Sequence, residues 1–229
     1  MDTRYNCLIR HIGRLRCVMA FDLGWKMNKC TYSIIKEISC NINWEYPVID
    51  IGSMVYDSRY DLRNIFHTVK GIDFREGNGV DLVGNIHTIS LHNEANTVIC
   101  TSMLEHDSDP VITLQQIKRI LTRNGKAIFT IPFNWFIHNY PSDYWRMTPD
   151  GLKIFLKKEF AHVQTFGIGR RLEPHTVVGV INAEINRDVI RKLNRDWPSE
   201  NGKVYHYAKM ILPPIFIHLI KWLMYRRFY

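Results

Sequence analysis

The chain has 229 residues, of which 46% are hydrophobic, a length and composition that suit one globular domain with appendages. Its formal net charge of +8 favours an anionic neighbour, which would be a membrane surface, a nucleic acid or an acidic substrate. The five cysteines are scattered and form no CxxC pair, so a zinc site is disfavoured and no metal is expected. The same pattern favours a reducing, cytoplasmic location.

Residues 1–45 are expected to form an N-terminal appendage. Arginines interleave with apolar residues between positions 4 and 18, without the apolar core of a secretory signal. We interpret this segment as a basic amphipathic helix lying on the domain or on a membrane, in preference to a transit peptide. Helical spacing over 32–38 predicts a further helix, which either covers one edge of a ligand pocket or only packs on the domain.

The central domain is expected to span residues 46–185 and begins with a buried strand over 48–51, which Gly52 ends in a tight turn. A second strand over 69–73 ends in the carboxylate of Asp73. A glycine turn after one strand and an acid about twenty residues later are typical of a nucleotide pocket in an open α/β sheet. The glycine admits the ligand close to the backbone, and the acid accepts hydrogen bonds from ribose hydroxyls. The alternative is that Asp73 only caps a turn.

Strands and helices alternate along the rest of this domain. In chain order the patterns predict a helix over 57–66, strands over 81–84 and 97–101, a helix from Pro110 to about Leu121 with Asp109 as N-cap, a turn at 124–125, a strand over 126–131, a helix over 150–158 capped by Thr148, and a strand over 160–166. Periodicity does not decide between strand and helix for 175–185, and 194–203 is predicted to be a loop.

A series of short motifs follows this order of elements. They are Val48–Ser53, Gly71–Glu76, Asp81–Asn85, Cys100–His106, Asp109–Pro110, Leu121–Lys126 and Pro141–Pro149. Together they resemble class I S-adenosylmethionine-dependent methyltransferases, in particular the small bacterial-type domain. The resemblance covers about half of the chain, and its most distinctive run is 143–149. It implies an α/β fold with a Rossmann-like, doubly wound, mostly parallel sheet and helices on both faces, and it implies S-adenosylmethionine as cofactor.

The resemblance also implies which residues bind the cofactor. They are Asp50, Gly52, Ser53, Asp73, Phe74, Asn85, Ile86, Thr101 and Ser102. In the family the acid corresponding to Asp73 holds the ribose, and the residue corresponding to Phe74 lies against the adenine. Thr101 and Ser102 are expected near the sulfonium end. The chain departs from the family pattern at Met54, where a second glycine is usual, and at Asn85, where aspartate is commoner. Met54 narrows the space for the methionine part, whereas Asn85 can still accept the adenine hydrogen bond.

Residues 132–149 are crowded with aromatic side chains and are expected to form the substrate-facing loop. His138 is the candidate catalytic residue, because an imidazole can take a proton from an attacking hydroxyl or amine. The candidate substrate-binding residues are Tyr140, Asp143, Tyr144 and Arg146. The alternative is that 144–146 packs the loop onto the sheet. Glu105 and His106 are assigned a structural role, bonding to each other or fixing a loop.

Residues 186–229 are expected to form a C-terminal loop and an amphipathic helix. Two prolines at 213–214 break the apolar tail, which is too short to span a bilayer. The helix from Ile215 fits an interfacial anchor on an anionic membrane surface, and equally a helix packed on the domain or on a second subunit. No nucleic-acid module is visible, which disfavours a nucleic-acid partner, and the oligomeric state stays open.

The main functional hypothesis is a methyltransferase that acts on a hydroxyl or amine of a small-molecule or glycan-like acceptor. Methyl transfer from a sulfonium needs alignment of the nucleophile, the methyl carbon and the sulfur, together with removal of one proton. The first alternative is a decayed methyltransferase fold that serves as a scaffold or partner subunit, because Met54 and Asn85 depart from the family pattern. The second alternative is an RNA-directed methyltransferase or an RNA-binding protein, motivated by the net charge of +8.

Overall fold

A computed structural model describes residues 29–135, 137–138 and 142–196 of the chain. The predicted basic helix near the N-terminus, the predicted membrane-associated tail and Tyr140 lie outside the described residues.

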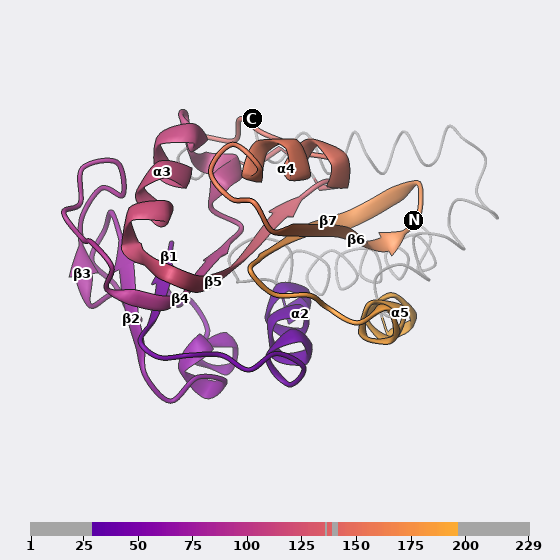
Figure 1. Cartoon of the computed structure of the whole chain (residues 1–229), viewed down its shortest axis with the longest axis horizontal. Coiled ribbons are helices and arrows are strands. Elements are labelled where there is room, and N and C mark those ends of the chain that lie inside the picture. Colours follow the sequence, from indigo (N-terminus) through magenta and orange to yellow (C-terminus); the bar gives the residue numbers. More distant parts are fainter. Residues whose placement is uncertain (1–28, 136, 139–141, 197–229) are drawn as a thin grey trace, which may run out of the picture.

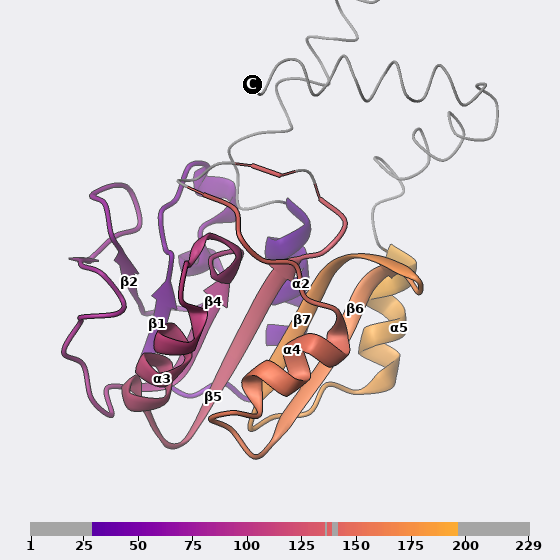
Figure 2. The same ribbon diagram turned by 90° about the horizontal axis from the view of Figure 1, so that it is seen from above.

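The described residues fold around one seven-stranded sheet, with strand order β3-β2-β1-β4-β5-β7-β6. The strands are β1 (Val48–Ile51), β2 (Val69–Asp73), β3 (Leu82–Val83), β4 (Ala95–Thr101), β5 (Leu121–Pro132), β6 (Val163–Arg170) and β7 (Glu173–Ile181). The pairs among β1 to β5 are parallel, and β7 is antiparallel to both β5 and β6. Figure 2 shows the strands side by side from above. The predicted mostly parallel, doubly wound sheet is confirmed.

Helices cover both faces of the sheet, as Figure 1 shows. Helices α3 (Pro110–Ile120) and α4 (Pro149–Leu156) lie on one face, and α2 (Lys29–Ser39) and α5 (Arg187–Asp196) lie on the other. Each face has its own buried apolar cluster, and alternate residues of the strands contribute to each. The fold therefore has a three-layer arrangement, with helices, sheet and helices in succession.

The predicted helix over residues 32–38 is α2, and its role is to pack on the sheet. Ile34, Ile35 and Ile38 are buried in the same apolar cluster as Ile99 of β4 and Val189 of α5. A helix from each of the two predicted appendages thus contributes to one core.

Parallel pairing brings the ends of four strands to one edge of the sheet. Ile51 at the end of β1 is level with Ile72 of β2 and with Cys100 of β4, and Asp73 of β2 is level with Val83 of β3. In open α/β sheets ligands bind beside the carboxyl ends of the strands, where the strand order reverses. Here the order reverses between β1 and β4, because β2 continues the sheet on one side of β1 and β4 on the other.

The helix predicted over residues 57–66 is wrong. The segment instead forms two 3₁₀ turns, Ser58–Tyr60 and Leu62–Asn64. The carboxylate of Asp57 accepts the Arg59 backbone N–H at 3.1 Å, and that of Asp61 accepts the Arg63 N–H at 2.9 Å. Each aspartate therefore starts a new short turn, and the local side-chain bonds compete with one continuous helix.

Other predicted boundaries need smaller corrections. The turn at 124–125 does not end α3, which stops at Ile120, and β5 begins at once with Leu121 paired to Ala95. The sixth strand runs over Val163–Arg170 instead of 160–166, and the undecided segment 175–185 contains β7. The first three residues of the predicted loop 194–203 belong to α5, whose buried Leu193 ties it to the core.

Within the described part of the chain, none of the helices has the length and apolar character that a membrane crossing requires.

The fold predicts that Gly71 does not tolerate a side chain. A Cβ at residue 71 would collide with the carbonyl oxygen of Gly79, which is backbone and cannot rotate away, and would lie 2.5 Å from the Ser53 hydroxyl. We expect Gly71→Ala to lower the free energy of unfolding by about 2 kcal/mol or more. Gly84→Ala is the matched control, because a Cβ there meets only Ile89 at 3.6 Å. Urea denaturation of both variants measures the difference, and equal stabilities would contradict the packing described.

Candidate functional site

The chain turns sharply at Gly52, directly after β1. Gly52 has a positive φ of 79°, which an L side chain rarely adopts, and a Cβ there would lie 3.0 Å from the Cγ of Met103. Its N–H and that of Ser53 donate to the Ile72 carbonyl of β2 at 2.9 and 3.2 Å. The predicted glycine turn therefore exists, and it is anchored to the strand that ends in Asp73.

Asp73 lies at the carboxyl end of β2, where the ribose-binding acid is expected. Its Oδ1 atom accepts the Arg75 backbone N–H at 3.2 Å, so the acid also starts the turn that follows. Phe74 is 55% exposed, and the Arg75 guanidinium lies 4.7 Å from the centre of its ring. An exposed aromatic ring that already carries a planar cation offers a stacking surface for an adenine.

Asn85 and Ile86 follow β3, beside the end of β2. The side-chain oxygen of Asn85 accepts the His87 N–H at 2.9 Å, so the amide holds a local turn. A carbonyl oxygen has a second lone pair, and the exposed Asn85 retains the capacity to accept another hydrogen bond. Ile86 is half-buried and packs against the core. The structure thus places the predicted ribose and adenine residues at two neighbouring strand ends.

The segment after Gly52 lies against the loop that follows β2. The Val55 N–H donates to the Asn78 carbonyl at 2.7 Å, and a Cβ at Gly77 would lie 3.0 Å from the Cε of Met54. The Ser53 hydroxyl is buried and makes no hydrogen bond. Met54 therefore points toward the 77–79 loop, and the two loops are joined in front of β1 and β2.

Asp50 is buried within β1. Its neighbours Ile49 and Ile51 pack on one face of the sheet, so the Asp50 side chain lies on the other face. Its Oδ1 atom has no hydrogen-bond partner. Burial raises the pKa of Asp50 to about 7, although the nearby Arg63 acts in the opposite direction. An unpartnered buried carboxyl under the glycine turn can accept a hydrogen bond from a ligand or from a rearranged backbone.

Thr101 and Ser102 lie where β4 ends. Thr101 is buried, and Ser102 has a positive φ of 48°, which reverses the chain as Gly52 does after β1. The Ser102 N–H donates to the Thr130 carbonyl at 2.9 Å. The predicted sulfonium-end residues therefore lie at the end of the strand adjacent to β1.

The described part of the predicted substrate loop is organised by Asp143. Its carboxylate accepts hydrogen bonds from both terminal nitrogens of Arg146, the one from Nη2 at 2.7 Å. It also accepts the His138 backbone N–H at 2.9 Å. The His138 Nδ1 atom lies 3.1 Å from the same carboxylate. The side chain of Asp143 is only 1% exposed, and the charge of Arg146 helps to hold its pKa below the usual value against the effect of burial. Asp143 therefore positions His138 and Arg146.

Tyr144 and Trp145 differ in their roles within this loop. Tyr144 is 53% exposed, and its backbone N–H donates to the Glu105 carbonyl at 2.7 Å. The indole N–H of Trp145 donates to the Asp107 carbonyl at 2.7 Å, which ties the loop to the segment before α3. Trp145 thus fits the packing alternative, whereas the ring of Tyr144 is available to an acceptor molecule.

Sequence reasoning missed Asp107, which joins three segments. Its carboxylate lies 2.9 Å from the His87 Nε2 atom and accepts the Thr113 hydroxyl at 2.5 Å and the Asp109 N–H at 2.9 Å. Asp109 occupies the predicted N-cap position of α3, but its side chain makes no capping bond. Asp107 instead accepts the backbone N–H of Asp109 itself and the Thr113 hydroxyl, so it fixes the beginning of α3 without capping its N–H groups, and the sequence holds no signal that distinguishes the two aspartates.

Glu105 and His106 lie between β4 and the substrate loop. The His106 Nδ1 atom bonds to the Ser142 carbonyl at 2.6 Å, which fixes the loop as one of the predicted structural roles requires. The His106 Nε2 atom lies 3.8 Å from Glu105, too far for the predicted mutual hydrogen bond. The ring of His106 meets that of His138 edge-on, with 4.8 Å between centres. The structure therefore brings Glu105, His106 and His138 together, which the sequence analysis did not predict.

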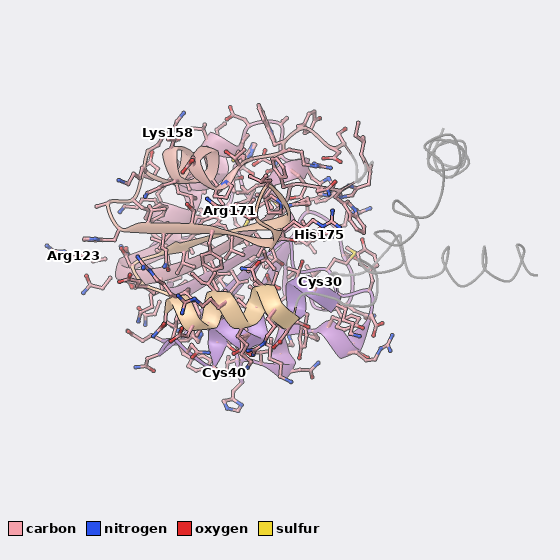
Figure 3. All side chains as sticks on the ribbon, turned by 90° about the vertical axis from the view of Figure 1, so that its right-hand side faces the viewer. Cys30, Cys40, Arg123, Lys158, Arg171 and His175 are labelled. Atoms are coloured by element: carbon pink, nitrogen blue, oxygen red, sulfur yellow. The ribbon has the colours of Figure 1, made fainter. Side chains whose placement is uncertain are left out.

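A surface hollow of about 790 Å³ lies at the other end of the sheet. Its lining residues include Lys118, Arg123 and Asn124 from the end of α3 and the beginning of β5. Figure 3 shows Arg123 and His175 at opposite ends of the molecule, and the His175 carbonyl accepts the Phe133 N–H directly after β5. The hollow is thus remote from the carboxyl ends of the strands.

No protein-family model and no curated protein matches the chain. Solved structures do resemble its fold. The 1,6-didemethyltoxoflavin-N1-methyltransferase of Burkholderia thailandensis, solved with S-adenosylhomocysteine, has a TM-score of 0.53 at 16% identity, over 79% of this chain and 89% of that one. A SAM-dependent methyltransferase of Archaeoglobus fulgidus has a TM-score of 0.53 at 13% identity, over 66% of this chain and 92% of that one.

A SAM-dependent methyltransferase of Thermotoga maritima has a TM-score of 0.51 at 14% identity, over 76% of this chain and 96% of that one. Together with the strand order, these likenesses show that the chain has the class I S-adenosylmethionine-dependent methyltransferase fold. Because the identities are low, they show the fold alone.

The burial of Asp50 predicts a pH dependence of stability. Its pKa rises from an ordinary 3.8 to about 7 on folding, so the folded protein binds one proton more between these values, and stability falls as pH rises through this window. Asp50→Asn removes the effect. We expect the stability of the variant relative to wild type to increase by about 2–4 kcal/mol between pH 4 and pH 8. Denaturation curves at both pH values test this, and a pH-independent difference would contradict it.

Proposed function

We propose that the protein is a methyltransferase that uses S-adenosylmethionine as methyl donor. The observation that carries the proposal is the pairing of the Gly52 turn with the strand that ends in Asp73, through the hydrogen bond from Gly52 to Ile72 at 2.9 Å. A bare backbone turn next to a carboxylate at a strand-order reversal is a site for an adenosyl group. The likeness to the Burkholderia enzyme, which holds S-adenosylhomocysteine, supports the same assignment.

The residues present fit the adenosine part of the cofactor. Asp73 would accept the ribose hydroxyls, Phe74 would stack on the adenine, and Asn85 would accept its amino group. Thr101 ends β4 and Ser102 follows it, and both would lie toward the sulfonium end of the cofactor. The cofactor supplies an electrophilic methyl group whose leaving group is neutral, so the protein contributes alignment above all.

We further propose that the acceptor is a hydroxyl or amine of a small-molecule or glycan-like compound. The exposed ring of Tyr144 and the guanidinium of Arg146 lie on the loop beside His138, where they would orient a polar acceptor. Asp143 holds the imidazole of His138 by its Nδ1 atom, an arrangement that orients a proton acceptor.

Calorimetric titration with S-adenosylhomocysteine tests the cofactor site. Asp73→Ala removes the carboxylate that would accept the ribose hydroxyls. We expect the affinity for S-adenosylhomocysteine to fall by about 10- to 100-fold, because hydrogen bonds to a charged group are lost. Glu76→Ala is the matched control, because it removes an exposed acid from the same loop. An absence of binding by the wild-type protein at millimolar ligand, or equal losses in the two variants, would contradict the proposal.

A specific observation favours a second candidate, a decayed methyltransferase fold that acts as a scaffold or partner subunit. Met54 packs toward Gly77, and Val55 is bonded to Asn78, so side chain and backbone occupy space in front of β1. In the family a glycine at the position of Met54 leaves room for the methionine part of the cofactor.

Met54→Gly distinguishes the two candidates. If the protein is an active methyltransferase, we expect the wild type to bind S-adenosylhomocysteine and the variant to differ by less than about tenfold, a change of 1.4 kcal/mol. A decayed site would show no binding in the wild type and a large gain in the variant. The same titration, with circular dichroism to verify folding, gives both readings.

A further inference from the structure

We propose that Glu105, His106 and His138 form a binding site for one divalent transition-metal ion, of the kind represented by Zn²⁺, Co²⁺ and Mn²⁺. One ligand atom from each of the three residues lies within 4.8 Å of the others. The residues come from two segments, the turn after β4 and the loop after β5, so the fold brings them together at the carboxyl edge of the sheet.

The environment of Glu105 favours a bound cation. Its side chain is fully buried, and neither carboxylate oxygen has a hydrogen-bond partner on another residue. Protonation alone does not satisfy the group, since a neutral carboxyl would still bury an unpaired O–H and an unpaired carbonyl oxygen. Buried carboxylates in proteins are paired, hydrogen-bonded or bound to metal ions. A cation between Glu105 and the two imidazoles would satisfy it.

The two histidines are oriented as metal-binding histidines are. The His106 Nδ1 atom bonds to the Ser142 carbonyl at 2.6 Å, so Nδ1 carries the proton and Nε2, which lies 3.8 Å from the Glu105 carboxylate, keeps its lone pair for an ion. The His138 Nδ1 atom lies 3.1 Å from the Asp143 carboxylate. Metal-binding histidines in proteins are typically held in this way, with one ring nitrogen donating to a backbone carbonyl or a carboxylate.

The distances require a small closure around the ion. With bonds of about 2.1 Å, tetrahedral ligand atoms lie about 3.4 Å apart. The His106 Nε2 atom and the Glu105 carboxylate are 3.8 Å apart, already close to this value. The side chain of His138 is 30% exposed, so a small shift of its ring can bring it nearer without disturbing the core. Two imidazoles and one carboxylate suit transition ions better than Mg²⁺ or Ca²⁺, which prefer oxygen ligands throughout.

The site changes the role expected for His138. A metal-bound imidazole no longer accepts a proton, so the ion would take over activation of the acceptor. This part rests on the proposed function. Three protein ligands leave a coordination position for an acceptor hydroxyl, whose pKa falls when it binds the ion. The hydroxyl proton passes to solvent water, the oxygen forms the new bond to the methyl carbon, and the electron pair of the broken carbon–sulfur bond stays on sulfur.

The test titrates the full chain, freed of metal by dialysis against a chelator, with Zn²⁺, Mn²⁺ and Mg²⁺ in a calorimeter. We expect one equivalent of Zn²⁺ or Mn²⁺ to bind and Mg²⁺ not to compete. At a hundredfold excess over the dissociation constant, the melting temperature should rise by about 5–10 °C. Bound Co²⁺ should show the visible absorption of an ion with imidazole ligands. Failure of wild-type protein to bind any of these ions at millimolar concentration would overturn the site.

Variants identify the ligands. We expect His106→Ala, His138→Ala and the isosteric Glu105→Gln each to weaken Zn²⁺ binding by at least about tenfold. His67→Ala is the matched control, because it removes an exposed histidine remote in sequence from the cluster. If one of these three variants does not fold, the Zn²⁺ affinities of the other two test the assignment. Equal affinities in the ligand variants and the control would overturn the assignment. Metal binding without S-adenosylhomocysteine binding would contradict only the proposed function. Binding of S-adenosylhomocysteine without metal binding would contradict only the metal site.

Discussion

The close approach of the loops that follow β1 and β2 is the constraint on which the candidate cofactor site depends. Gly71 and Gly79 leave no room for a Cβ where β2 and the two loops meet. Arg63 bonds to both the Gly79 carbonyl and the Asp81 carboxylate, at 2.9 and 2.6 Å. Asp81 in turn accepts the Gly71 N–H at 2.6 Å. These contacts fix the end of β2, and therefore Asp73, relative to the turn at Gly52.

A second group of interactions builds the proposed acceptor side. Asp107 holds the beginning of α3, and its carbonyl accepts the Trp145 indole, while Asp143 gathers His138 and Arg146. Both carboxylates are nearly inaccessible, with side-chain exposures of 6% and 1%. They therefore hold the surrounding segments in place without being accessible to a ligand themselves. The exposed Tyr144 and the cluster of Glu105, His106 and His138 are the residues that we propose to contact an acceptor and an ion, respectively.

The sequence predicted the elements whose signals are local. Strands β1 and β2 have the expected bounds, because each contains β-branched apolar residues and is ended by a turn residue or an acid. Thr148 caps α4, as its position before Pro149 indicates. The predicted helix over 57–66 does not form, because the side chains of two aspartates in this segment each bond to a nearby backbone N–H and start a short turn. Tertiary contacts decided what periodicity left open, such as β7, which pairs with both β5 and β6. The meeting of Glu105 with His138 joins residues 33 positions apart across two loops, and no spacing rule predicts it.

The most direct test of the central claim is a crystal structure of the protein with S-adenosylhomocysteine. The account predicts that the ribose hydroxyls lie within hydrogen-bond distance of the Asp73 carboxylate and that the ligand passes over the Gly52 backbone, with the adenine against Phe74. A ligand bound elsewhere, or a turn at Gly52 still closed by Met54 and Val55 under saturating ligand, would contradict it.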